Sequence, residues 1–463
     1  MTYREALEFL DSFQNYEQIT AYRYPEAFSL DRVQKLLARL GNPHRSYPVL
    51  HVAGTKGKGS TCAFAASILS AAGLKTGLYT SPHLISFRER IRVDGRPISE
   101  TELLQTVERI RPFAGKDLTY FEVTTACAFL YFQEAGVQAA VIEVGLGGRL
   151  DATNLVEPAV SAITPVSLDH MPKLGSILAQ IAREKAGILK QGVPAVIAPQ
   201  AAQALQVIEQ TAALLGIELH RVDQEVRIEP AEISLSGSSA TFRTPRRDYP
   251  GLRIPLLGRH QLMNAAMAIR MVELFSQRRP DLRVTERAVR EGIARTEWPG
   301  RCQLIPGEPP VLLDGAQNAE SARVLRSAVG DLFSGRKIVL VVGASQEKDL
   351  EGMARVWGPW ADRIFLTQAK SLRSEPVDRL FEVFLHFHPS VERTGSVEEA
   401  LQRAAEEAGP GGAVVVSGSL FVAAEALQAL SAKTQPQMSS QGITTSIPQK
   451  SLEGASGIRP RGV

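Results

Sequence analysis

Cysteine is scarce in this chain of 463 residues, which has only Cys62, Cys127 and Cys302. The three are far apart and odd in number, which argues against a disulfide framework, and their spacing is not that of a cysteine metal site. We therefore expect a protein of a reducing compartment, and the cytoplasm is the simplest location.

Long apolar runs are also missing. Nowhere do 18 consecutive apolar residues occur, and the first residues, MTYREALEFLDSF, alternate charged and apolar side chains without an apolar signal core. The sequence therefore predicts neither a membrane span nor a membrane partner.

Net positive charge is absent from most of the chain. The formal net charge is +3 at pH 7, and residues 433–463 carry all of it, with four basic residues against one acidic residue. Residues 1–432 are formally neutral, so we expect no basic face for nucleic acid. The tail 433–463 is rich in Ser, Gln, Thr and Gly, and we expect it to be disordered because it has little apolar surface to offset the entropy of ordering.

The pattern that is present is that of an α/β protein with two domains. The chain exceeds the roughly 250 to 300 residues at which a single core stops growing. A Pro-Gly break in WPGR separates two series of alternating strands and helices, which predicts a first domain at 1–297 and a second at 298–432. Between about residues 218 and 258 the apolar period shifts toward two, which predicts a small antiparallel side sheet.

Apolar segments rich in β-branched residues predict the buried strands. In the first domain they are VLHVAG (49–54), TGLYTS (76–81), AAVIEV (139–144), AVSAIT (159–164) and PAVIA (194–198), and in the second VLLD (311–314), KIVLVVG (337–343), RIFLT (363–367) and AVVVSGS (413–419). Helical segments lie between them, so we expect parallel sheets and a cleft between the domains that binds ligands at the carboxyl ends of strands.

The most specific local motif is GTKGKGS at 54–60, a glycine-rich turn between a predicted strand and a predicted helix. Backbone N–H groups in such a turn gather around a phosphate, and the helix N-terminus adds partial positive charge. The motif departs from the strict GxxxxGK[ST] pattern, because Gly59 stands between Lys58 and Ser60. It favours phosphate binding over the alternative, a glycine turn with solvated lysines.

Three candidate magnesium ligands follow other predicted strands. Ser81, Glu143 and His170 each lie at or just beyond the carboxyl end of a strand, where they can converge on the phosphate. A lone serine is usually a turn residue and a lone histidine is usually not a ligand, but a carboxylate such as Glu143 at the end of an apolar strand is costly unless paired or metal-bound. Lys185 is either a helix lysine paired with an acid or a buried lysine of lowered pKa that can be carbamylated.

Seven stretches of sequence occur in the order seen in one family. They are GTKGKGSTCAF, SPHLISFRERIRVDGRPIS, TYFEVTTACAFLYF, VIEVGLGGRLDATN, LDHM followed by REKAGILK, GRHQLMNAAMAI and WPGRCQ. On these stretches the chain resembles the folylpolyglutamate synthases and dihydrofolate synthases of the Mur ligase superfamily. The resemblance implies an N-terminal P-loop ATPase domain and a smaller, Rossmann-like C-terminal domain that acts as the glutamate-ligase domain.

The resemblance also implies roles for individual residues. The implied ATP-binding residues are Thr55, Lys56, Gly57, Lys58, Gly59, Ser60, Asn264, Arg301 and Asp314, with Lys58 as the phosphate lysine. The implied magnesium ligands are Ser81, Glu143 and His170, and Lys185 matches a carbamylated lysine. The implied substrate-binding residues are Ser81, His83, Thr119, Tyr120, Phe121, Glu122, Leu150, Asp151 and Ala152, with 81–97 as a mobile loop. Lys58, Lys185, His170 and Arg301 are the implied catalytic residues.

The reaction implied is the formation of an amide with ATP and Mg²⁺. The carboxylate of dihydropteroate, or of the terminal glutamate of a reduced folate, attacks the γ-phosphate, and the amine of L-glutamate then attacks the acyl phosphate. Positioning and neutralisation of charge are the protein's main tasks in such chemistry. The alternatives are another Mur-type amino-acid ligase, a P-loop kinase or ATPase, and a non-catalytic nucleotide-binding regulator, and a monomer is the default state.

Two positions depart from the family's pattern. Gln317 in LDGAQN stands where the family usually has histidine, so a role that needs a charged imidazole is not available there. Lys56 stands where bacterial members often have asparagine, which adds a positive charge beside the phosphates.

Overall fold

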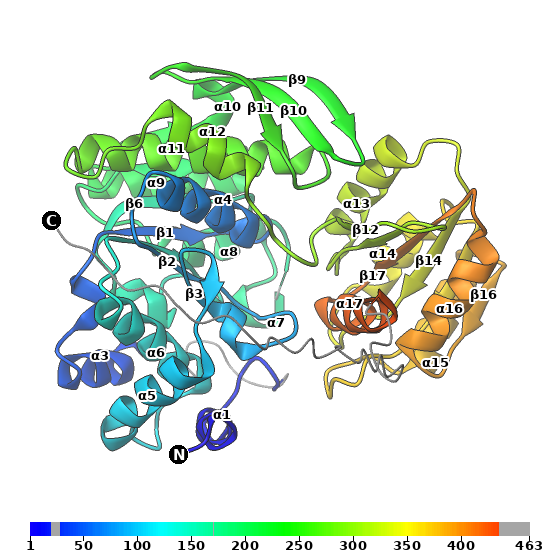
Figure 1. Ribbon diagram of the computed structural model, residues 1–463, viewed down its shortest axis with the longest axis horizontal. Coiled ribbons are helices and arrows are strands. Elements are labelled where there is room, and N and C mark those ends of the chain that lie inside the picture. Colours follow the sequence, from blue (N-terminus) through cyan, green and yellow to red (C-terminus); the bar gives the residue numbers. More distant parts are fainter. Residues whose placement is uncertain (20–27, 170, 435–463) are drawn as a thin grey trace, which may run out of the picture.

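The structure is a computed structural model that describes residues 1–19, 28–169 and 171–434. The described chain forms two α/β domains that lie side by side, with a small three-stranded sheet over the first (Figure 1). This arrangement confirms the predicted fold class. His170 and nearly all of the tail 433–463 lie outside the described residues, so the expected disorder of the tail stays a prediction.

The larger sheet carries the glycine-rich turn 54–60. Its eight strands in the described chain lie in the order β4-β3-β2-β5-β1-β6-β7-β8, and they are parallel from β2 to β8 and antiparallel at the β3 and β4 edge. The bounds are β1 (Val49–Ala53), β2 (Thr76–Tyr79), β3 (Ile91–Val93), β4 (Arg96–Pro97), β5 (Ala139–Glu143), β6 (Pro158–Ile163), β7 (Ala195–Ile197) and β8 (Leu219–Arg221). The five segments predicted as strands in this domain all form strands.

Helices cover both faces of this sheet. Alternate residues of β1 point to opposite faces, so Leu50 and Val52 belong to one apolar core and Val49 to the other. The helices are α1 (Tyr3–Asp11), α3 (Leu30–Arg39), α4 (Lys58–Ala71), α5 (Glu100–Ile110), α6 (Tyr120–Glu134), α7 (Met171–Leu174), α8 (Leu178–Ala186), α9 (Ala202–Leu215), α10 (Val222–Glu225), α11 (His260–Arg278) and α12 (Glu286–Ala294), with short 3₁₀ turns η1 (Pro43–Arg45), η2 (Phe87–Arg90), η3 (Arg111–Phe113) and η4 (Ala152–Leu155). Helix α4 packs against α11 and α12, which fixes the helix that begins at the phosphate-binding turn.

The predicted side sheet forms, but it begins later than expected. Strands β9 (Arg227–Ser234), β10 (Gly237–Arg243) and β11 (Asp248–Ile254) pair antiparallel in the order β11-β10-β9. Residues 219–221, which the sequence pattern placed in this sheet, instead form β8 and pair parallel with β7. Three residues are too few for an apolar period to separate the two possibilities.

The second domain is a smaller sheet covered by helices on both faces. Its strands in the described chain lie in the order β12-β13-β17-β14-β15-β16, and all pairs are parallel except β12 with β13. The elements are β12 (Gln303–Ile305), β13 (Val311–Leu313), α13 (Ala319–Leu332), β14 (Ile338–Val342), α14 (Leu350–Trp357), β15 (Arg363–Leu366), α15 (Val377–Leu385), β16 (Val391–Arg393), α16 (Val397–Ala408), β17 (Ala413–Ser417) and α17 (Leu420–Thr434). Strands β12 and β16 and helix α16 were not predicted from the sequence.

Two observations bear on the expected location of the protein. None of the described helices is long and apolar enough to cross a membrane. Cys62, Cys127 and Cys302 are free thiols, and all three are buried.

Candidate functional site

The glycine-rich turn 54–60 leads from β1 into α4 as the sequence predicts. Gly57 has φ +85°, a conformation that strongly favours glycine, and the Oδ1 atom of Asn264 lies 2.4 Å from where a Cβ on Gly57 would stand. The N–H groups of Thr55 and Lys56 donate to the carbonyl of Pro165 at 3.0 and 3.3 Å. No side chain caps the N-terminus of α4, so the N–H groups of its first turn are available to an anion.

Lys58 and two of the candidate magnesium ligands lie together beyond this turn. The Nζ atom of Lys58 is 3.8 Å from Oε1 of Glu143, and Oε2 of Glu143 accepts the N–H of Ser81 at 3.2 Å. Glu143 is only 5% exposed, and burial raises the pKa of its carboxyl above the usual range. The structure thus brings Ser81 and Glu143 to Lys58, the predicted phosphate lysine.

Lys185 reaches the same turn from α8. Its Nζ atom donates to the carbonyl of Gly54 at 2.8 Å, and the side chain is buried. Burial, together with the positive charge of Lys58, lowers the pKa of Lys185 to about 7. At neutral pH a large share of this amine is therefore uncharged.

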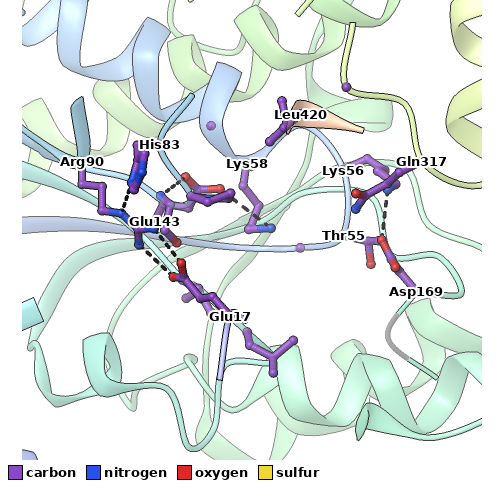
Figure 2. Close-up of a pocket in the computed structure, with 18 of the residues that line it drawn as sticks. Glu17, Thr55, Lys56, Lys58, His83, Arg90, Glu143, Asp169, Gln317 and Leu420 are labelled. Carbon is purple, nitrogen blue, oxygen red and sulfur yellow. Dashed lines mark hydrogen bonds and ion pairs between the residues drawn. The ribbon is translucent and has the colours of Figure 1, made fainter. Parts of the chain in front are cut away.

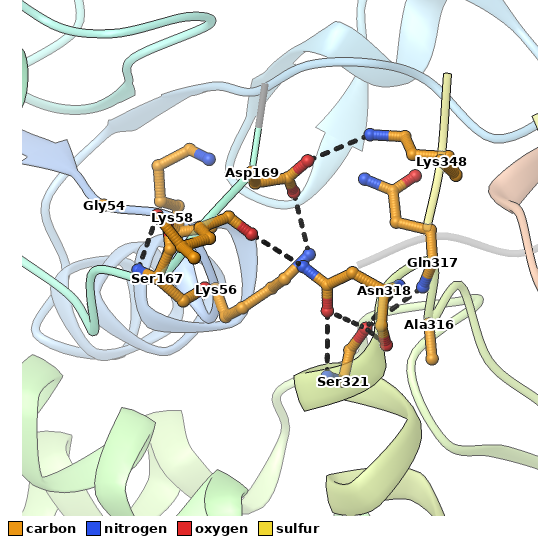
Figure 3. Close-up of polar contacts among 12 residues, drawn as sticks. Gly54, Lys56, Lys58, Ser167, Asp169, Ala316, Gln317, Asn318, Ser321 and Lys348 are labelled. Carbon is orange, nitrogen blue, oxygen red and sulfur yellow. Dashed lines mark hydrogen bonds and ion pairs between the residues drawn. The ribbon is translucent and has the colours of Figure 1, made fainter. Parts of the chain in front are cut away.

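A second ionic cluster links the turn to the second domain. Asp169 accepts Nζ of Lys56 on one oxygen and Nζ of Lys348 on the other, both at 3.0 Å (Figure 3). Lys348 follows β14, so Asp169 bridges the domains. Beside it, Nδ2 of Asn318 donates to the carbonyl of Leu168 at 3.4 Å.

Three predicted nucleotide-contacting residues lie near the junction of the domains. Asp314 accepts the N–H groups of Cys302 and Ala316 at 2.9 and 2.8 Å, so it fixes the segment after Arg301 to the end of β13. Nδ2 of Asn264 donates to Oε1 of Gln261 at 2.9 Å. Asn264, Arg301 and Asp314 all line the same cavity as the turn.

That cavity has a volume of about 880 Å³ and lies between the two domains. Figure 2 shows Lys58 near its centre, with Glu143, His83 and Arg90 toward one side and Lys56, Asp169 and Gln317 toward the other. Most of the predicted site residues line it: Thr55, Lys56, Gly57, Lys58, Gly59, Ser60, Ser81, His83, Thr119, Tyr120, Phe121, Glu143, Asp151, Lys185, Asn264, Arg301 and Asp314.

Comparison with known proteins identifies the family. Residues 52–272 match the Mur ligase middle domain, and residues 300–420 match the Mur ligase glutamate ligase domain. The dihydrofolate synthase/folylpolyglutamate synthase of Bacillus subtilis is 39% identical over 334 residues, which cover 70% of this chain and 77% of the relative. The chain belongs to the folylpolyglutamate and dihydrofolate synthases, a family of Mur ligases.

Solved structures of this family share the fold over nearly the whole chain. Mycobacterium tuberculosis folylpolyglutamate synthase complexed with ADP has a TM-score of 0.84 at 31% identity and covers 92% of this chain and 97% of its own. Escherichia coli FolC in complex with DHPP and ADP has a TM-score of 0.83 at 31% identity and covers 94% of this chain and 98% of its own.

Three residues predicted to bind substrate lie outside the wall of the cavity in this synthase. Glu122 caps α6 together with Thr119 and also accepts the guanidinium of Arg32 at 2.9 Å, while Leu150 and Ala152 flank Asp151 without lining the cavity. Asp151 lines the cavity, but its carboxylate already accepts the N–H groups of Gly145, Leu146 and Thr153 and the hydroxyl of Thr153. The assignment of Glu122, Leu150, Asp151 and Ala152 to substrate binding therefore stays a prediction.

The synthase also has site residues that sequence reasoning missed. Arg90 is 2% exposed, donates from Nη1 and Nη2 to the carboxylate of Glu17 at 2.8 and 2.6 Å, and donates from Nε to Nδ1 of His83 at 2.8 Å. Burial, with Arg90 beside it, lowers the pKa of His83 to about 4. Arg373 of the second domain donates to the backbone carbonyl of Glu17. No local sequence motif marks Glu17 as a site residue. Lys348 follows a predicted strand, so it could have been predicted in the same way as Ser81.

Proposed function

We propose that this protein is an ATP- and Mg²⁺-dependent amide ligase that joins L-glutamate to dihydropteroate or to the terminal glutamate of a reduced folate. One observation carries the proposal: a single cavity contains the phosphate-binding turn, the carboxylate Glu143 and the end of the second domain's sheet. The relatives named for folylpolyglutamate and dihydrofolate synthesis, and the FolC structure with DHPP and ADP, support the choice of substrates.

The phosphates of ATP fit the first turn of α4. The uncapped N–H groups hold the phosphate chain, and Lys58 places a positive charge beside the γ-phosphate. The substrate carboxylate then attacks the γ-phosphorus, ADP leaves, and an acyl phosphate remains. The amine of glutamate attacks the acyl carbon, and phosphate leaves. Arg301, at the junction of the domains, is positioned to neutralise the charge that develops.

The donors near Lys58 fit a magnesium ion. The hydroxyl of Ser81 and the carboxylate of Glu143 are hard oxygen ligands, and the buried Glu143 is compensated chiefly by the Lys58 ammonium, 3.8 Å away, with a smaller contribution from Arg301. Among the described residues no three His, Cys, Asp or Glu side chains gather into a metal site, so we expect His170, phosphate oxygens and water to complete the coordination. A bound Mg²⁺ supplies charge neutralisation at the β- and γ-phosphates.

Lys185 fits the chemistry of a carbamate. Carbon dioxide reacts with an uncharged amine, and the pKa of Lys185 near 7 keeps much of this amine uncharged at neutral pH. The reaction releases a proton and leaves a carboxylate on Nζ, the atom that donates to the carbonyl of Gly54 at 2.8 Å. We propose that this carbamate helps to hold the metal ion near Glu143.

The second domain supplies the remaining wall, where we place the incoming glutamate. Lys348 and Gln317 come from the carboxyl ends of strands β14 and β13, and both line the cavity. Gln317 offers hydrogen bonds but no titratable proton, so proton removal from the amine of glutamate falls to another group or to water. We divide the chain accordingly into an ATP-binding domain at 1–297 and a glutamate-ligase domain at 298–432.

We also propose that the protein acts as a monomer in the cytoplasm. Both domains of this chain contribute described residues to the cavity. The three free, buried cysteines suit a reducing compartment.

The test is a product assay with purified protein, ATP, Mg²⁺ and isotope-labelled glutamate, in which dihydropteroate and tetrahydrofolate are offered separately. We expect ADP release that depends on glutamate, and a product heavier by one or more glutamate residues with at least one acceptor. Omission of glutamate is the control. ADP release at the same rate without glutamate would show a kinase or ATPase instead.

A further inference from the structure

Trp298 lies in the segment that joins the two domains, three residues before Arg301. It is half-buried and packs against the apolar core that contains α4, but it is not among the residues that line the cavity. Any influence it has on the reaction must therefore pass through its neighbours.

The first neighbour is Gly59, in the phosphate-binding turn of α4. A Cβ atom on Gly59 would lie 2.9, 3.0 and 3.1 Å from Cζ2, Nε1 and Cε2 of the indole; real Cβ atoms essentially never approach as closely as the first distance, and the other two are tighter than most contacts. Gly59 is helical, so its backbone does not require glycine, and alanine is the better helix former. The ring of Trp298 therefore explains the glycine that breaks the strict phosphate-loop pattern.

The second neighbour is Arg92 of β3, whose guanidinium carbon lies 5.6 Å from the centroid of the indole. Nε of Arg92 donates to the carbonyl of Glu89 at 3.1 Å. The carboxylate of Glu89 in turn accepts three consecutive N–H groups, those of residues 84–86, at 2.9, 3.0 and 2.8 Å. Glu89 and Arg92 thus connect the loop that carries Ser81 and His83 to the indole ring of Trp298.

The residues after Trp298 are held just as closely. A Cβ on Gly300 would lie 3.1 Å from Cδ1 of Leu84, and one on Gly315 would lie 2.9 Å from Nη1 of Arg301. The joining segment therefore packs against the loop 81–97, the turn of α4 and the second domain.

We propose that Trp298 is a positioning residue that keeps the phosphate-binding turn of α4 in register with Arg301. The inference deepens the proposed function and rests on it for the roles of Lys58 and Arg301. The ring fixes where the joining segment meets the turn, and Arg301 follows at a fixed distance along the chain. An error of about 1 Å in such a placement can cost on the order of 100-fold in rate.

A double-mutant cycle between Gly59 and Trp298 tests the contact. We expect Gly59→Ala to lower kcat about 10- to 100-fold when Trp298 is present, because the methyl group displaces the ring or the turn. In a Trp298→Ala background the same substitution should cost less than about twofold, because the ring that it would meet is gone. Equal losses in both backgrounds would overturn the proposal and show that the phosphates themselves demand the glycine.

Two further measurements separate positioning from a structural role. Trp298→Ala should lower kcat while the thermal midpoint of unfolding changes little, whereas Trp360→Ala, at a half-buried tryptophan of the second domain away from the cavity, should leave kcat at the wild-type value. Equal kcat values for Trp298→Ala and Trp360→Ala would contradict the proposal.

Tryptophan emission during titration with ADP gives a readout that needs no turnover. We expect the change in emission to persist in Trp360→Phe and to disappear in Trp298→Phe. A change that persists in Trp298→Phe would contradict the contact. If the wild-type protein binds ADP in this assay but shows no glutamate-dependent turnover, the proposed function fails while the contact is still decided by the emission.

Discussion

The two ends of the cavity are built in different ways. At the phosphate end, a continuous stretch from Gly54 to Ser60 offers backbone N–H groups and one lysine. At the end that we propose binds the acceptor, dihydropteroate or folate, Glu17 is far along the chain from the loop that carries His83 and Arg90, and side-chain hydrogen bonds join Glu17 to Arg90 and Arg90 to His83. The phosphate end therefore depends on its few charges and its glycines, whereas the acceptor end depends on side-chain pairs and should lose stability and affinity together.

The largest expected effect is at the phosphate end. Lys58→Ala removes the ammonium 3.8 Å from Glu143 and beside the proposed γ-phosphate, so glutamate-dependent ADP formation should fall at least about 1,000-fold. The fold should persist, because α4 is held by α11 and α12. A coupled ADP assay and circular dichroism measure the two quantities. Lys116→Ala, at an exposed lysine, is the matched control, and near wild-type turnover in Lys58→Ala would refute the role of the turn.

The next effect concerns Lys185 and pH. Because folding lowers the pKa of this lysine to about 7, its amine is protonated below that pH and cannot form a carbamate. Activity should therefore fall as pH drops through about 7, and added bicarbonate should raise it near that pH. Lys185→Met should lose about 10- to 100-fold in activity and the response to bicarbonate.

The lowered pKa of Lys185 also predicts how the stability of the protein depends on pH. The unfolded chain holds the proton up to about pH 10.4, the ordinary value for lysine, so between pH 7 and 10 the unfolded state binds more protons than the folded state. The free energy of unfolding should then rise with pH in that window for wild type, and rise less for Lys185→Met.

A carbamate signal in ¹³C NMR with labelled bicarbonate checks the carbamylation of Lys185 directly, and the absence of this signal at pH 8 would contradict the proposed carbamate.

At the acceptor end, Glu17→Gln should affect stability and substrate affinity together. It leaves the charge of Arg90, which is 2% exposed, without its carboxylate, and we expect a loss of about 3 kcal/mol in the free energy of unfolding. The carboxylate then no longer fixes Arg90, which donates to His83, so the KM for the acceptor should rise while the KM for ATP stays near wild type. Denaturant titration and steady-state kinetics measure both.

The control for Glu17→Gln is Glu8→Gln, which breaks the exposed pair of Arg4 and Glu8 on α1. An exposed pair of this kind contributes less than about 1 kcal/mol, so stability and both KM values should change little. Equal losses of stability in the two variants would show that the buried pair has no special role.

The contrast between the two ends also explains what the sequence could predict. The turn 54–60, the strands before Ser81 and Glu143 and the order of domains follow from local pattern, and the structure has them as expected. The partners of Arg90 and Asp169 could not be predicted, because Glu17 is 73 residues from Arg90 and Lys348 is 179 residues from Asp169. The edge strands β12 and β16 were missed because most of their residues are only partly buried, so they lack the continuous apolar run that marks the equally short β7 and β13.

The smallest expected effect is at the bridge between the domains. Lys348→Met removes one of the two ammonium groups on Asp169, whose side chain is 8% exposed, while Lys56 still compensates the carboxylate. A hydrogen bond to a charged group contributes about 1.5 to 3 kcal/mol. Because Lys56 still pairs with Asp169, the affinity for substrate should fall less than about tenfold. We expect this loss of affinity as a rise in the KM for glutamate, because Lys348 lies in the second domain, where we place the glutamate. A rise confined to the KM for ATP would instead assign Lys348 to the phosphate end.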